Sequence, residues 1–255
     1  MQEGHSLRGS QARRPRKRAC ATLMTAVVAL LASVGLFGTG QTGDVLRWKG
    51  KAYSLFSNPL ERYLDTHPDV RPRGDVISTA NWRGYVATWE VREQKLFLTN
   101  VEVEIARKDG AKDRLETERR SVLESLFPGQ HTVLAEWYTG HLIVPDGKLI
   151  RYVHMGYASL YKKYIAFRVE RGTVVRQWTL DAASYSTFRA QQFARYKQTE
   201  AYRASVKDLQ KEGDTLERID AFLFDVAVEE YMSRIFDDKI RALPSKRMHP
   251  TAGTR

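Results

Sequence analysis

The chain has 255 residues, of which 42% are hydrophobic and 28% are charged, and its formal net charge is +11. This composition is typical of a folded globular protein and argues against wholesale disorder. The positive charge alone would suggest a nucleic-acid-binding protein. However, residues 1–18 carry six basic side chains against the single acid Glu3, so nearly half of the excess charge belongs to the N-terminal tail. We therefore expect no nucleic-acid partner.

The N-terminal tail leads into a stretch without charged residues, from Ala19 to Phe37. A helix of about 20 apolar residues is long enough to cross a bilayer. One interpretation is an uncleaved anchor over residues 19–38, with the basic tail, residues 1–18, in the cytoplasm and the remainder outside it. The other is a signal segment cleaved before Gln41, which releases a secreted or periplasmic domain. The basic cluster argues against a third interpretation, a buried helix of a soluble fold.

The only cysteine, Cys20, lies at the start of this apolar stretch. The remainder of the chain can therefore form neither a disulfide nor a cysteine metal site. No two histidines have the helical spacing of a zinc hydrolase with a glutamate between them, and no phosphate-binding glycine loop or dinucleotide fingerprint is present. We expect no metal and no cofactor.

Beyond the apolar stretch the pattern predicts an α+β fold. A linker over residues 39–50 leads into a predominantly antiparallel β domain over residues 51–180, with six to eight strands. A helical hairpin over residues 181–243 follows, and a disordered tail over residues 244–255 ends the chain.

The β domain begins with a helix signal, since Asn58 can cap a helix and Pro59 occupies its first position. Residues 85–91 then alternate between the two faces of a strand. Residues 95–105 continue the pattern with a slip near Thr99, which predicts a bulge. The two runs predict a β-hairpin.

Residues 107–120 are highly charged and predict an exposed loop. A strand is predicted over residues 131–144 and ends in the turn Pro145-Asp146-Gly147. Residues 164–169 and 173–178 are separated by a glycine-containing turn and predict a second hairpin.

The C-terminal part changes character. Residues 182–211 contain neither glycine nor proline and predict one long helix, which Gly213 ends. A second helix from Asp214 places apolar residues at helical spacing. If that apolar face is exposed, residues 214–240 would mediate a homo-oligomer.

The densest group of polar and aromatic residues runs from Ser78 to Glu90. In a functional interpretation its arginine holds a carboxylate or phosphate, and aromatic rings stack on the ligand. In the structural alternative the rings pack in the core and Arg83 pairs with an acid such as Glu90. The predicted ligand-binding residues are Trp82, Arg83, Tyr85 and Tyr157.

The catalytic candidates are His154, Glu136 and Glu90. His154 can act as a general base near neutral pH, but a lone histidine in an aromatic turn is more often structural. Glu136 precedes His141 by five residues, and on a continuous strand this spacing puts the two side chains on opposite faces.

Several short segments together resemble a group of uncharacterised bacterial proteins, over roughly residues 50–175. The resemblance implies a bacterial origin and a compact single domain, and it supplies no activity and no catalytic residue. The segments that carry it include Asn58-Pro59-Leu60-Glu61, Trp82-Arg83-Gly84-Tyr85, Trp89-Glu90, Leu126-Phe127-Pro128 and Val153-His154-Met155-Gly156-Tyr157.

Two functions remain open on the sequence. The favoured one is a membrane-anchored, extracytoplasmic module that binds a small ligand or an envelope protein, because no nucleophile or metal cluster has convincing spacing. The alternative is an extracytoplasmic hydrolase that acts on an envelope component through His154 and a nearby carboxylate.

Overall fold

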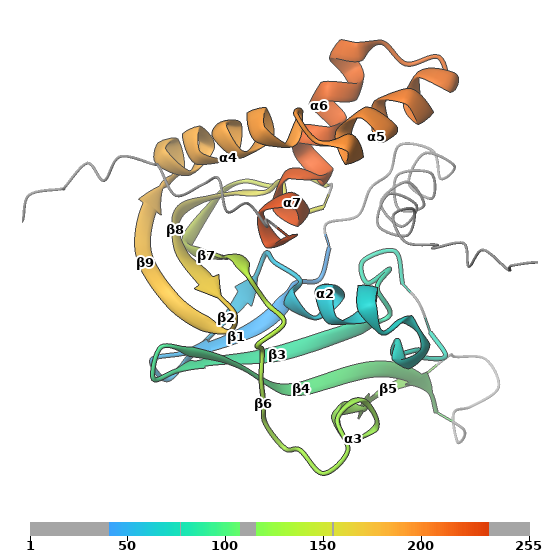
Figure 1. The fold of residues 1–255 in the computed structure, drawn as a ribbon, viewed down its shortest axis with the longest axis vertical. Helices are drawn as coiled ribbons and strands as arrows, with labels where there is room; N and C mark the ends of the chain where they lie inside the picture. Colours follow the sequence, from blue (N-terminus) through green and yellow to red (C-terminus); the bar gives the residue numbers. More distant parts are fainter. Residues whose placement is uncertain (1–40, 77, 108–115, 155, 235–255) are drawn as a thin grey trace, which may run out of the picture.

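The computed structural model describes residues 41–76, 78–107, 116–154 and 156–234 (Figure 1). The predicted anchor over residues 19–38 and the predicted C-terminal tail lie outside these ranges. No helix within the described ranges is long and apolar enough to span a membrane.

The fold is mixed α/β, with a large, mostly antiparallel sheet and several helices at the C-terminal end (Figure 1). The strands are β1 (Asp44–Trp48), β2 (Lys51–Leu55), β3 (Tyr85–Arg92), β4 (Lys95–Ala106), β5 (Thr117–Ser121), β6 (Val133–Leu134), β7 (Gly140–Arg151), β8 (Leu160–Glu170) and β9 (Thr173–Asp181). The helices are α2 (Pro59–Thr66), the short 3-10 helix η1 (Pro68–Val70), α3 (Leu123–Leu126), α4 (Ala182–Tyr196), α5 (Glu200–Lys211), α6 (Leu216–Val226) and α7 (Val228–Arg234).

The sheet has two wings. Its main path runs β2-β1-β3-β4-β9-β8-β7, and β5 and β6 pair with β4 beside this path. The paired strands β4 and β9 share the single register position Lys95–Thr173, so the first wing (β2-β1-β3-β4) and the second wing (β9-β8-β7) join at a narrow point. The wings curl toward each other, and the backbone N–H of Phe56 donates to the carbonyl of Ile143 at 2.7 Å.

Both predicted hairpins are confirmed. β3 and β4 meet at Glu93 and Gln94, whose φ angles of 51° and 56° are those of a tight hairpin turn. The pairing register shifts after Thr88, so that Thr99 is the extra residue of the predicted bulge. β8 and β9 meet at a second turn that contains Gly172, with a φ of 76°.

Two predicted loops contain strands. The predicted linker over residues 39–50 contains β1, where alternate residues Asp44 and Leu46 are buried. The charged segment over residues 107–120 ends in β5, which is exposed along its length and pairs with β4, while residues 108–115 lie outside the described ranges. Charged side chains are common on such exposed edges, which is why composition alone did not reveal this strand.

Three other boundaries differ from the prediction. The strand predicted over residues 131–144 is divided, because a loop separates β6 from β7. The predicted turn at residues 145–147 lies inside β7, where the pairing with β8 shifts. The predicted helix over residues 182–211 is two helices, since Thr199 caps a new one by accepting a hydrogen bond from the N–H of Tyr202. The C-terminal region therefore has more helices than the predicted hairpin.

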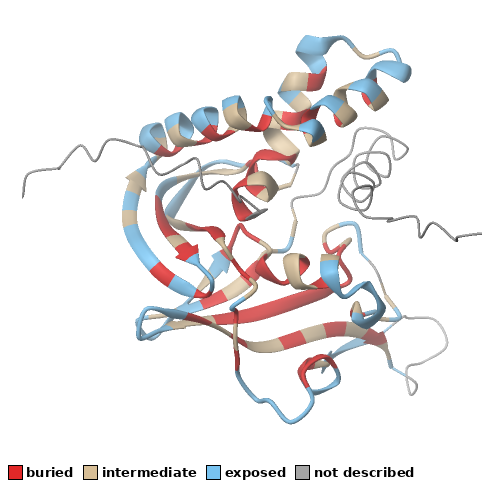
Figure 2. Cartoon of the chain, in the orientation of Figure 1, coloured by how far each residue is buried: buried red, intermediate tan, exposed pale blue. Residues whose placement is uncertain are grey.

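The inner parts of β7 and β8 are buried on both faces, as their consecutive buried residues show, whereas β9 is mostly exposed (Figure 2). Leu142 and Val144 pack with the first wing and α2, in the main core. Ile143 and Tyr164 point to the other face and pack with residues of α4 and α7. A sheet covered on both faces requires apolar runs without alternation, which explains the sequence of these strands.

The last described helix, α7, lies directly on β7. Gly140 makes this approach possible, because a Cβ atom there would stand 2.7 Å from the carbonyl oxygen of Ser233. Val228 and Met232 of α7 are fully buried. α7 therefore covers the second wing and contacts α2 of the first.

Candidate functional site: a buried arginine network beside a tyrosine pocket

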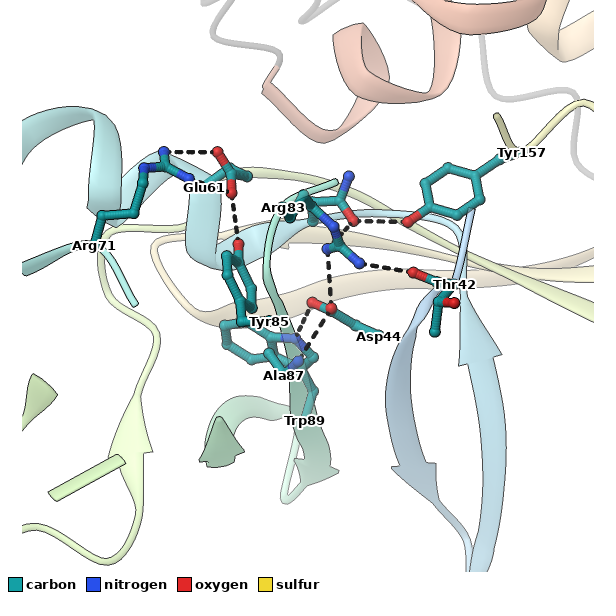
Figure 3. Close-up of polar contacts among 10 residues, drawn as sticks. Thr42, Asp44, Glu61, Arg71, Arg83, Tyr85, Ala87, Trp89 and Tyr157 are labelled. Carbon is teal, nitrogen blue, oxygen red and sulfur yellow. Dashed lines mark hydrogen bonds and ion pairs between the residues drawn. The ribbon is translucent and has the colours of Figure 1, made fainter. Parts of the chain in front are cut away.

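A buried carboxylate, Asp44, joins β1 to β3 (Figure 3). Its Oδ1 accepts hydrogen bonds from Arg83 Nη1 at 3.0 Å and from the backbone N–H of Ala87 at 3.2 Å. Its Oδ2 accepts one from Trp89 Nε1 at 2.9 Å. The Arg83 and Asp44 side chains are 1% and 0% exposed, so the ion pair is shielded from water.

Arg83 connects this pair to two further segments. Its Nη1 donates to Asn58 Oδ1 at 2.5 Å, and its Nη2 donates to the carbonyl of Thr42 at 2.8 Å. The hydroxyl of Tyr157 donates to the same Asn58 oxygen at 3.0 Å. Asn58 stands at the cap position before α2, as predicted, but its side chain caps no backbone N–H. Its oxygen serves the arginine and the tyrosine instead.

A second branch of the network surrounds Glu61 on α2 (Figure 3). Its carboxylate accepts two hydrogen bonds from Arg71, at 3.0 and 2.9 Å. The hydroxyl of Tyr85 donates to Glu61 at 2.7 Å, and the Tyr85 ring lies 5.3 Å from the guanidinium of Arg83. We call these two branches together the Arg83 network.

Burial and neighbouring charge set the ionisation of the central pair. Burial raises the pKa of Asp44 above its ordinary value, against the opposing effects of Arg83 and the bond from Trp89. Burial alone would lower the pKa of Arg83, but the acidic groups around it, with Tyr157 and Asp44 foremost, raise that pKa overall.

Burial and neighbouring charge also set the pKa values of Glu61 and Tyr157. Burial acts to raise the pKa of Glu61, but the bonds and charge of Arg71 outweigh it and lower that pKa. Burial raises the pKa of Tyr157 to about 12. The Tyr157 hydroxyl is therefore a protonated donor across the physiological pH range.

A pocket of about 490 Å³ opens beside the Arg83 network. Its walls come from residues 41–45, from β2 and from the connection between β7 and β8. Among the lining residues that the structure describes, the only charged one is Asp44, whose carboxylate is already engaged in the network. We call this cavity the tyrosine pocket after its five aromatic residues, Tyr53, Phe56, Tyr152, Tyr157 and Tyr161.

The rings at the base of the tyrosine pocket hold one another in place. Phe56 and Tyr157 stack with centroids 4.9 Å apart and an interplanar angle of 15°. Tyr161 meets Phe56 edge-on at 5.9 Å. The pocket therefore presents a preformed aromatic surface.

Three of the predicted ligand-binding residues come together in the Arg83 network, namely Arg83, Tyr85 and Tyr157. Of these, only Tyr157 lines the tyrosine pocket. Trp82 lies in the turn before β3, is half-buried and stands outside the pocket lining. The guanidinium of Arg83 faces protein groups, which favours the structural alternative, with Asp44 in place of Glu90 as the paired acid.

The catalytic candidates are dispersed. Glu90, at the outer part of β3, lies 3.5 Å from Arg92. Glu136 is exposed in the loop between β6 and β7. His154 is exposed beyond β7, and its Nδ1 lies 2.9 Å from the hydroxyl of Tyr152. Within the described ranges no hydrogen bond or ion pair joins any two of the three candidates, and no group of three metal-ligating side chains occurs.

A second buried arginine–carboxylate pair lies among the helices. Nε of Arg189 on α4 is 2.6 Å from the carboxylate of Glu229 on α7, and the Tyr185 hydroxyl donates to the same carboxylate at 3.2 Å. Nη2 of Arg189 also donates to the carbonyl of Phe224 at 2.9 Å, and its guanidinium lies 4.4 Å from that residue's ring. Burial raises the pKa of Glu229.

His141 stands where the second wing meets the helices. Its ring makes edge-on contacts with Trp178 on β9 at 5.9 Å and with Phe188 on α4 at 5.5 Å. Burial lowers its pKa to about 4, assisted by the charge of Arg168. His141 is therefore neutral at physiological pH and acts as a packed aromatic residue.

Sequence reasoning missed Asp44 and most of the tyrosine pocket. Asp44 lies in the predicted linker, although the apolar residues Val45, Leu46 and Trp48 before Gly50 are a strand signal. Tyr53, Phe56 and Tyr161 carried no signal of their own, because aromatic residues on strands are mostly core.

No family model matches the chain, and no curated protein and no solved structure matches it. The segments that resemble bacterial proteins contribute six residues to the Arg83 network: Asn58, Glu61, Arg83, Tyr85, Trp89 and Tyr157. A function must therefore be argued from the geometry of the network and the pocket.

Proposed function

We propose that this chain is a membrane-anchored binding module outside the cytoplasm, and that its tyrosine pocket holds a neutral ligand with hydroxyl groups and an apolar face, such as a sugar ring. The observation that carries the proposal is the aromatic lining of an open pocket of about 490 Å³. Ligand pockets are concave, mostly apolar and provided with a few polar groups that fix orientation.

The charge of the lining supports a neutral ligand. A phosphate or carboxylate would need a cation, and the nearest guanidinium, Arg83, is committed to Asp44, Asn58 and Thr42. The Asp44 carboxylate in the wall neutralises the Arg83 charge, so the pair offers no net positive charge to an anion.

The polar groups of the lining support a ligand with hydroxyl groups. The hydroxyls of Tyr53 and Tyr161 have no partner among the described residues, and a tyrosine hydroxyl both donates and accepts. Ser54, exposed at the mouth, adds a third hydroxyl. Aromatic faces beside such groups suit the apolar face of a sugar ring.

The binding test uses the full chain in detergent micelles, titrated with neutral disaccharides and N-acetylated amino-sugar oligomers and followed by saturation-transfer NMR. We expect binding that Tyr161→Ala weakens about tenfold, because one ring contact contributes about 1.4 kcal/mol. The matched control is Phe97→Ala, which removes a half-buried aromatic residue of β4 outside the pocket and leaves the affinity unchanged. Binding of inorganic phosphate in preference to every neutral sugar would refute the proposal.

The location is proposed from the sequence, namely the basic tail and the apolar residues 19–38. A reporter fused after residue 243 should be active only outside the cytoplasm, and cytoplasmic activity would contradict export. Mass spectrometry of the mature N-terminus separates the anchored form from a secreted or periplasmic form.

The hydrolase alternative stays a prediction. His154 has a tyrosine neighbour at the edge of the tyrosine pocket, but neither predicted carboxylate contacts it. Oligomer formation through residues 214–240 also stays a prediction. Ile219, Leu223 and Val228 in that range are buried within the chain, whereas Leu216 is 50% exposed.

A further inference from the structure

The described chain begins at the tyrosine pocket. The backbone N–H of Gln41 donates to the carbonyl of Gly156 at 3.0 Å, and that of Thr42 donates to the carbonyl of Ala80 at 2.7 Å. Both residues line the pocket. The apolar stretch of the sequence ends at Phe37, and four residues span at most about 14 Å. A membrane anchor in that stretch would hold the pocket within this distance of the bilayer.

The outer end of β7 and the residue that follows it carry apolar side chains that face water. Leu149, Ile150 and Tyr152 are 41%, 56% and 59% exposed. Tyr152 also lines the tyrosine pocket, so this strand end lies beside the point where the described chain begins. Exposed apolar groups gathered at one place mark an interaction surface.

Basic residues flank these apolar side chains. Lys148 and Arg151 are exposed on the same strand, and Lys162 and Lys163 are exposed on β8 beside it. Two acids lie nearby, since Lys163 stands between Asp146 on β7 and Asp181 on β9 in the strand pairing. Apolar and aromatic side chains among lysines and arginines are the composition that binds the interface of an anionic membrane.

We propose that residues 148–152, the membrane rim, dock on the anionic surface of the same bilayer that holds the anchor. This inference rests on the proposed function and deepens it, because it makes the ligand a sugar carried on a membrane lipid. The docked rim turns Tyr152 and the pocket mouth toward the lipid headgroups. The membrane rim thus binds the bilayer itself. Contact with a partner protein is the alternative that the experiment below distinguishes.

The single cysteine permits a direct test. Cys20→Ser gives a cysteine-free full chain, into which Ile150→Cys places an environment-sensitive dye. The labelled protein is reconstituted into vesicles of phosphatidylethanolamine and phosphatidylglycerol that contain a nitroxide-labelled headgroup lipid. We expect blue-shifted emission and strong quenching at position 150.

The matched control places the dye at Val175, which is 50% exposed on β9 near the other end of the β8–β9 hairpin, about 27 Å away along the strands. Quenching at position 150 should exceed that at position 175 severalfold. Lys148→Glu combined with Arg151→Glu should reduce the difference, and so should vesicles of phosphatidylcholine alone.

Equal quenching at positions 150 and 175 would overturn the docking proposal. A blue shift that persists without quenching would also overturn it, because it would indicate a protein contact in place of lipid. Sugar binding by the unmodified chain in micelles is measured separately. Loss of docking with sugar binding intact rejects the rim alone, whereas absence of sugar binding rejects the proposed function.

Discussion

Two buried arginine–carboxylate pairs stabilise different parts of this chain. The Arg83–Asp44 pair joins β1 to β3 at the wall of the tyrosine pocket, and both side chains are at most 1% exposed. The Arg189–Glu229 pair joins α4 to α7, and its arginine is 10% exposed. In the first pair the carboxylate accepts from Arg83 and from two donors on β3, the N–H of Ala87 and Nε1 of Trp89. In the second pair the carboxylate accepts from Arg189 and from the hydroxyl of Tyr185.

The difference shows that similar chemistry performs two tasks. Around Arg83, the partners of the pair include Asn58 and, through it, Tyr157, so the pair sets the position of a pocket residue. Around Arg189, the partners are structural, and Glu229 and Tyr185 lie outside the pocket lining. Removal of each pair should therefore have different consequences for stability and for binding.

The largest effect is expected for Asp44→Ala. This change leaves the Arg83 charge buried without its carboxylate partner and the Trp89 N–H without its acceptor, which should lower the free energy of unfolding by about 3–5 kcal/mol. Urea denaturation followed by tryptophan fluorescence measures it. Asp69→Ala is the control, since that residue is exposed and the change should alter stability by less than about 0.5 kcal/mol. A similar small loss in both variants would mean that the Arg83 network contributes little.

A smaller loss is expected for Glu229→Ala, about 2–3 kcal/mol, because the Arg189 side chain is 10% exposed, so water can solvate part of its unpaired charge, whereas the Arg83 side chain is 1% exposed. Hydrogen exchange should show lost protection in α4 and α7 and preserved protection in β1 and β3. Glu217→Ala, at an exposed position of α6, should leave exchange unchanged. Reduced protection in β1 would show that the two pairs are coupled. It would contradict the view that each pair stabilises its own part of the chain.

The smallest effect is a pH dependence of the free energy of unfolding, caused by His141 where the second wing meets the helices. His141 has a pKa of about 4 in the folded protein against an ordinary value of 6.5. The unfolded chain therefore binds this proton first, so the stability that His141 contributes is complete above pH 6.5 and is lost as the pH falls toward 4. The loss should reach about 2 kcal/mol at about pH 5.

His141→Leu should remove this contribution. Unfolding free energies of the variant and the parent, measured between about pH 8 and pH 5, should differ by an amount that changes with pH. His131→Leu, at an exposed position, should leave the pH profile unchanged. A parallel pair of profiles for His141→Leu and the parent would contradict a buried neutral histidine.

Local patterns predicted the parts of the fold that local chemistry determines. The hairpin from Tyr85 to Ile105 and its bulge at Thr99 follow from alternation and turn residues within one short range. The strand β1 was missed although its turn to β2 at Lys49 and Gly50 is local, and its burial depends on the parallel partner β3, which lies about forty residues further along the chain. Single-sequence patterns carry no information about such distant pairing.

The candidate site shows the same limit. Arg83 and Tyr157 were singled out from local composition, and the structure brings both into one network. The acid that pairs with Arg83 could not be chosen by sequence, since its burial depends on strands from separate segments. The tyrosine pocket likewise forms only where three separate segments of the chain meet. No single segment has a sequence pattern that indicates a pocket.

The position of α7 on β7 also constrains the order in which the chain can complete its fold. Synthesis proceeds from the N-terminus at about 5–20 residues per second, and α7 is the last described helix to be made. Until it arrives, the face of β7 that carries Ile143 lacks the contact with Met232 and is covered only in part, by residues such as Phe56 and Tyr185, and Gly140 has no helix against it. A nascent chain stopped before Val228 would therefore leave part of this sheet face exposed to solvent. Such an exposed apolar face promotes aggregation. The second wing can complete its core only after α7 has left the ribosome.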